Sequence, residues 1–104
     1  MSFTGNEDHS IPLATASQWT KNYRDANPSG VTIAHFYGKE AIMAILSQAN
    51  CVGIRIYYAL DDNGAKQLIL VGANAAENDL YNGLLAERSV KCPEQCSSAN
   101  PLNS

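Results

Sequence analysis

The sequence predicts a small α+β domain, in which two N-terminal helices pack on one face of an antiparallel sheet. Residues 51–60 and 66–74 are two runs of apolar, β-branched and aromatic residues, and Asp61-Asp62-Asn63-Gly64 joins them. Because Asn-Gly supplies the positive φ angles of a tight turn, the two runs are predicted to form an antiparallel β-hairpin. Two strands alone are only marginally stable in water, so the sheet needs a further strand. That strand comes from residues 31–37, from the C-terminal region or from a second subunit.

Two amphipathic helices are predicted before the hairpin. The first begins near Thr15 or Ser17, which offer N-cap chemistry, and its apolar spacing places Trp19 and Tyr23 on the buried face. Pro28 ends this helix, because proline keeps the residue before it out of helical geometry. Residues 39–49 form the second helix, with one apolar face at i, i+3, i+4, i+7. Residues 31–37 are either a short strand or an irregular lead into that helix.

The first strand of the hairpin has two different faces. The even-numbered positions share one face and the odd-numbered positions share the other; these are Ile54, Ile56, Tyr58 and Leu60, and Gly53, Arg55, Tyr57 and Ala59. The second strand is apolar on both faces, which is typical of the interior of a sheet. After it, the helical spacing of residues 80–85 indicates a short third helix, weakened by Gly83.

The length of 104 residues predicts a single domain, with residues 1–12 as a loose lead-in. Residues 97–104 form either a loop packed on the body or a frayed tail. Ten acidic and seven scattered basic residues give a net charge of −3, which disfavours binding to nucleic acid or to an anionic membrane. Without a signal-peptide pattern or a membrane-length apolar run, we expect a cytoplasmic protein, unless a leader was removed.

Cys92 and Cys96 are the residues with the most evident chemistry. Their spacing allows either a small-loop disulfide or two thiolate ligands of a soft metal, with Cys51 or a histidine completing the site. A thiol redox role is a further alternative. No helix is predicted after Pro93 to lower a thiol pKa, and a second metal half-site is missing, so structural thiols or a disulfide are favoured.

Arg55 interrupts an apolar strand, where a guanidinium needs a partner to offset its desolvation. One interpretation is a pocket for an anionic ligand, formed by Arg55, Tyr57 and His35. The favoured alternative is an exposed sheet face, or an internal pair with a residue such as Asp79 or Glu87. His35 has no recognisable nucleophile or orienting carboxylate in a catalytic motif, which favours a structural role.

The chain also resembles a group of short uncharacterised bacterial proteins over about residues 11–102. The resemblance is carried by Trp19-Thr20-x-Asn22-Tyr23-Arg24, Gly38-Lys39-Glu40, Leu46-x-Gln48, Cys51-Val52-Gly53-Ile54-Arg55-Ile56-Tyr57, Leu70-Val71-Gly72, Asn78-Asp79 and Cys92-Pro93-x-x-Cys96-Ser97. It implies a bacterial cytosolic setting and a free-standing domain. It implies no activity, cofactor or catalytic residue.

These observations together favour a non-enzymatic binding or protein-interaction module without a cofactor. Only 16% of the residues are charged, and such a surface leaves room for apolar patches. The hairpin also has too few strand partners of its own. We therefore expect a homodimer that associates through an exposed sheet face or edge. The alternatives are a small-molecule binder or enzyme with the Arg55 pocket, and a thiol redox or metal-binding protein.

Overall fold

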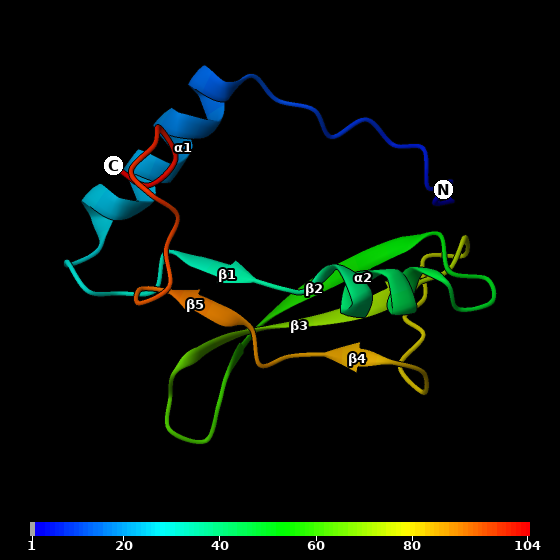
Figure 1. Ribbon diagram of the computed structural model, residues 1–104. Helices are drawn as coiled ribbons and strands as arrows, with labels where there is room; N and C mark the ends of the chain where they lie inside the picture. Colours follow the sequence, from blue (N-terminus) through cyan, green and yellow to red (C-terminus); the bar gives the residue numbers. More distant parts are fainter. Residues whose placement is uncertain (1) are drawn as a thin grey trace. The chain divides into compact units, whose positions relative to one another are not determined.

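The structure, a computed structural model, describes residues 2–104 and divides them into two compact units (Figure 1). The first unit contains residues 2–7 and 37–89, and the second contains residues 8–36 and 90–104. Helices and small antiparallel sheets occur together, so the predicted α+β fold class is confirmed. The expectation of one domain across the whole chain stays a prediction.

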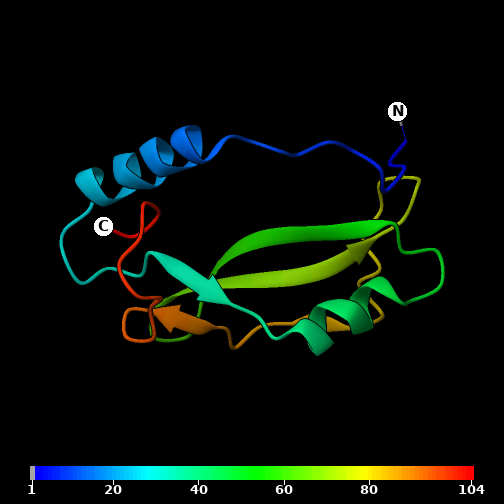
Figure 2. The same cartoon turned by 45° about the horizontal axis from the view of Figure 1, so that its top comes forward.

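The first unit is built on a three-stranded antiparallel sheet. Strands β2 (Gly53–Leu60), β3 (Lys66–Ala73) and β4 (Leu85–Ala86) lie in the order β2-β3-β4. The predicted hairpin is confirmed, because β2 and β3 pair along their full length, as Figures 1 and 2 show. β3 is therefore the central strand, which agrees with its apolar residues on both faces.

Asp61 organises the turn of the hairpin. Its Oδ1 accepts hydrogen bonds from the backbone N–H groups of Asn63 and Ala65, each at 2.9 Å, and its own N–H donates to the carbonyl oxygen of Ala65 at 2.9 Å. Of the Asn-Gly pair, only Gly64 has a positive φ, at 79°. The turn is thus a three-residue loop with glycine in the left-handed conformation, and not a two-residue turn.

Helix α2 (Lys39–Leu46) contacts all three strands of this sheet. Its Ile45 is buried, as are Leu70, Val71 and Ala73 of β3. These side chains form the core of the first unit. The helix ends three residues before the predicted end: the N–H of Ser47 still donates to the carbonyl oxygen of Met43 at 2.9 Å, and the chain then turns.

The third helix expected over residues 80–85 is absent from the described structure. Instead, an isolated bridge pairs Ala73 with Asp79, the N–H of Leu80 donates to the carbonyl oxygen of Gly72 at 2.8 Å, and β4 adds to β3. The segment therefore satisfies backbone groups on the outer side of β3. Pairing with a buried strand has outweighed a weak helical pattern that Gly83 already interrupts.

The second unit contains helix α1 (Leu13–Ala26) and the paired strands β1 (Ala34–Phe36) and β5 (Val90–Cys92). The strand expected within residues 31–37 is thus present. The expected burial of Trp19 and Tyr23 is wrong, because no residue of α1 is buried and Trp19 is 61% exposed. The apolar spacing indicated the helix, and Arg24 of α1 has hydrogen-bond partners within this unit.

The C-terminal segment supplies those partners. The Arg24 guanidinium donates to the carbonyl oxygens of Leu102 at 2.6 Å and Ser104 at 3.0 Å. Within the segment, Asn100 Oδ1 accepts from the N–H of Leu102 at 2.8 Å. The carbonyl oxygens of Leu102 and Ser104 therefore connect the end of the chain to α1.

Candidate functional site

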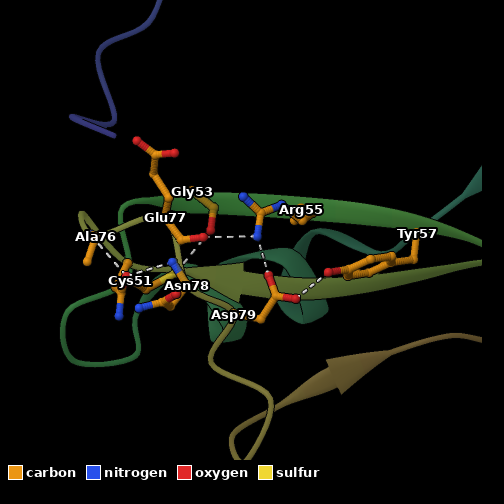
Figure 3. Close-up of polar contacts among 9 residues, drawn as sticks. Cys51, Gly53, Arg55, Tyr57, Ala76, Glu77, Asn78 and Asp79 are labelled. Carbon is orange, nitrogen blue, oxygen red and sulfur yellow. Dashed lines mark hydrogen bonds and ion pairs between the residues drawn. The ribbon is translucent and has the colours of Figure 1, made fainter. Parts of the chain in front are cut away.

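Arg55 has internal hydrogen-bond partners on one face of β2 (Figure 3). One of its terminal nitrogens, Nη1, lies 2.6 Å from Asp79 Oδ1 and 3.2 Å from the carbonyl oxygen of Glu77. The phenol of Tyr57 donates to the other carboxylate oxygen, Asp79 Oδ2. The guanidinium carbon also lies 5.4 Å from the centre of the Phe3 ring, within cation–π range.

The loop after β3 places Asp79 beside Arg55. Asn74 Oδ1 accepts from the backbone N–H groups of Ala76 and Asn78, each at 3.0 Å, and the N–H of Asn74 donates to the carbonyl oxygen of Asn78 at 3.0 Å. This local side-chain bonding is what asparagine offers in turns. It folds residues 74–78 back on themselves, so that the backbone of Asp79 pairs with Ala73 while its side chain reaches Arg55 of β2.

The electrostatics of this cluster favour a charged Arg55 and Asp79 and a protonated Tyr57 phenol. The hydrogen bond from Tyr57, followed by the contact with Arg55, lowers the pKa of Asp79, so the carboxylate stays ionised. The same carboxylate raises the pKa of Arg55 and the pKa of Tyr57, in each case chiefly by hydrogen bonding. Both carboxylate oxygens are thus used within the protein. The cluster ties the loop after β3 to β2, and Arg55 already has an anion beside it.

His35 lies in β1, in the second unit, opposite Lys91 of β5. Burial, followed by the positive charge of Lys91, lowers the pKa of His35. Arg55 and Tyr57 share Asp79 in the first unit, whereas His35 belongs to the other unit. The pocket of Arg55, Tyr57 and His35 for an anionic ligand stays a prediction.

The three cysteines separate into a disulfide and a free thiol. Cys92, at the end of β5, is bonded to Cys96, and the free Cys51 donates from Sγ to the carbonyl oxygen of Gly53 at 3.2 Å. Among residues 2–104, no group of three or more His, Cys, Asp or Glu side chains is arranged to hold a metal ion. Redox or metal chemistry at these cysteines stays a prediction.

Gln48 forms a packed junction that the sequence did not reveal. Its Nε2 donates to the carbonyl oxygen of Ile45 at 2.9 Å, and its Oε1 accepts from the N–H of Leu84 at 2.8 Å, so it connects α2 to the segment before β4. Gly72 and Gly83 both lie against this side chain. The missed signal was Gly83, whose interruption of a helical pattern indicated a close approach.

The outer edge of β2 is the second candidate site. The hydrogen bond between Asp61 and Ala65 fixes the alternation of the antiparallel ladder, so the odd-numbered residues of β2 bond to β3. The N–H and C=O groups at the even-numbered positions therefore point away from β3. Within residues 2–104, β2 pairs with no strand other than β3.

The two outer sides of the hairpin differ in how they are covered. On β3, the carbonyl oxygen of Leu68 accepts from the hydroxyl of Tyr37, and the carbonyl oxygen of Gly72 accepts from the N–H of Leu80. On β2, large apolar side chains at the even-numbered positions are exposed, at 53% for Ile56, 93% for Tyr58 and 70% for Leu60. Its one charged residue, Arg55, is paired. β2 thus lacks the lysines and prolines that commonly protect edge strands.

Comparison of the chain with protein families, with curated proteins and with solved structures finds no significant match. Neither α1 nor α2, the two helices in the described part of the chain, has the length and apolar character needed to cross a membrane.

Proposed function

We propose that this protein is a non-enzymatic interaction module that self-associates by pairing strands at the edge of β2. Such pairing gives affinity through main-chain hydrogen bonds, and side chains along the strand add specificity. The observation that carries the proposal is the apolar edge of β2, whose even-numbered backbone groups point away from β3. The low fraction of charged residues adds support.

The Arg55 cluster supports this proposal rather than an anion pocket. An external anion would compete with Asp79, whose Oδ1 lies 2.6 Å from the guanidinium. Because Arg55 is paired with Asp79, β2 carries no unpaired charge that would repel the same charge on a second copy of the strand. The cluster also ties β2 to the loop after β3, which favours an edge that is formed before it binds.

A charge introduced at the edge of β2 tests this proposal, because charged side chains keep natural edge strands from pairing with another chain. The variant is Tyr58→Lys, and the matched control is Tyr81→Lys, which changes a similarly exposed tyrosine (71%) outside the strands. Sedimentation velocity from about 1 to about 100 µM would follow the mass of each protein. We expect the wild type and Tyr81→Lys to associate alike, and Tyr58→Lys to need at least about tenfold higher concentration.

A wild-type protein that stays at its monomer mass of 11.2 kDa throughout would refute self-association. Equal weakening by the two lysines would show that a general change in charge, and not the edge of β2, controls the association. Far-UV circular dichroism of each variant confirms that the fold is kept, so that a loss of association is not a loss of structure.

A further inference from the structure

Resting on the proposed function, we infer that two copies of the chain pair β2 with β2 in an antiparallel register centred on Tyr57. The even-numbered residues of β2 present their N–H and C=O groups outward, so they must meet even-numbered residues of the partner strand. The twofold axis perpendicular to the sheet must then pass at a residue of β2, because an axis midway between two residues would place even-numbered residues opposite odd-numbered ones.

The length of β2 selects among the possible axes. With the axis at Tyr57, Ile56 lies opposite Tyr58 of the second copy and Ile54 lies opposite Leu60, so every outward-facing residue of the strand is paired. Moving the axis to Ile56 or Tyr58 leaves one of the four outward-facing residues of β2 opposite a residue that lies outside the strand. The register centred on Tyr57 therefore forms the most main-chain hydrogen bonds.

Charge and side-chain shape favour the same register. It places Arg55 opposite Ala59 of the second copy, whereas an axis at Arg55 would put two guanidinium groups directly opposite each other. Because an antiparallel pair keeps matching faces on the same side, the exposed Tyr58 ring would contact Ile56 of the second copy. Aromatic and β-branched side chains are favourable cross-strand neighbours.

The resulting assembly is one continuous sheet, in the order β4-β3-β2-β2-β3-β4. Its contact is confined to a single strand from each copy. An interface of this kind falls in the small class, below about 1,200 Å² in total, which is typical of weak and reversible complexes. We therefore expect a dimer that dissociates on dilution.

Disulfide crosslinking tests the register. In a Cys51→Ala background, Tyr57→Cys places two thiols in a pair without main-chain hydrogen bonds, where Cα atoms are about 4.5 Å apart and a disulfide can form. Ala59→Cys is the matched control. Its two copies would be offset by four residues, or about 13 Å, which is too far for a disulfide. Under mild oxidation we expect Tyr57→Cys to form the covalent dimer at least about tenfold faster.

A second pair of cysteine variants keeps the Tyr57 ring, so that its result does not depend on a dimer that has lost this ring. A mixture of Arg55→Cys and Ala59→Cys proteins should form a mixed disulfide, while neither protein should crosslink alone. If Ala59→Cys reacts as fast as Tyr57→Cys, or if no combination crosslinks, the register is refuted. A wild type that sediments as a dimer would then keep the proposed function, whereas a monomeric wild type would remove both.

Discussion

Gly72→Ala is expected to destabilise the first unit, because this position lacks room for a methyl group. Gly72 lies in β3, and a Cβ there would be 2.9 Å from Cys51 Sγ, 3.1 Å from Gln48 Nε2 and 3.3 Å from Leu80 Cδ1. Cβ contacts shorter than 3.4 Å force the neighbouring atoms to move. A glycine is therefore required here by space.

The size of the stability loss in Gly72→Ala depends on how firmly the side chains around Gly72 are held. Gln48 is hydrogen-bonded at both ends of its amide, to Ile45 and to Leu84, and the Cys51 thiol is bonded to Gly53. Overpacking of this kind costs about 1–3 kcal/mol, and the reduced freedom of the unfolded chain returns about 0.4–1 kcal/mol. The free energy of unfolding should fall by about 1.5 kcal/mol, which lowers Tm by about 6–12 °C in a chain of this size.

Thermal and urea unfolding, followed by circular dichroism, measure this change. Gly53→Ala is the matched control, because it lies in the paired strand β2 and an added Cβ would meet nothing within 4 Å. It should be neutral or slightly stabilising. Combining Gly72→Ala with Cys51→Ala removes the closest contact and should recover part of the loss. Equal stabilities of Gly72→Ala and Gly53→Ala, or no recovery in the double variant, would refute the steric reasoning.

A single measurement tests each of three other features of the structure: the Asp79 cluster, the Arg24 contacts and the disulfide. The pKa of Asp79 is lowered in the folded state, so its stabilising contribution is present above pH 3.8 and is lost as the pH falls through the lower folded value. The difference in unfolding free energy between wild type and Asp79→Asn should therefore shrink below about pH 4. A difference that does not change with pH would contradict this. Arg24→Gln should speed proteolysis of the C-terminal segment in a mass-spectrometric time course, while Lys21→Gln, on the same helix, should not. Thiol titration in denaturant should find one thiol, that of Cys51, before reduction and three after it; three before reduction would exclude the disulfide.

The sequence predicted the elements whose signals are local. The alternation in residues 51–60 and the turn at residues 61–64 specify the hairpin from neighbouring residues alone, and the structure confirms it. The start of α1 at Leu13 was missed, because Pro12 precedes the helix and presets φ at −68°, while the expected cap at Thr15 or Ser17 lies inside the helix.

Signals that depend on distant partners were harder to interpret. The spacing of residues 80–85 suits a helix, but the unpaired side of β3 recruited the segment as turns and β4. The partner of Arg55 was anticipated as one of two carboxylates, and the loop shaped by Asn74 brings Asp79 to it. Phe3 was missed, because a single aromatic residue in a polar lead-in has no periodicity to indicate its contact with Arg55.

The order of the chain through the two units has a consequence for dissecting the protein. Residues 37–89 interrupt the second unit, whose two parts are joined by the pairing of Phe36 with Val90. The ends of the interrupting piece are therefore neighbours, and removing it would leave a gap that a very short peptide could bridge. Cutting the gene at any one point would divide at least one unit, whereas excising residues 37–89 keeps every residue of the second unit. Deletion studies of the second unit should therefore excise the middle of the chain rather than shorten its ends.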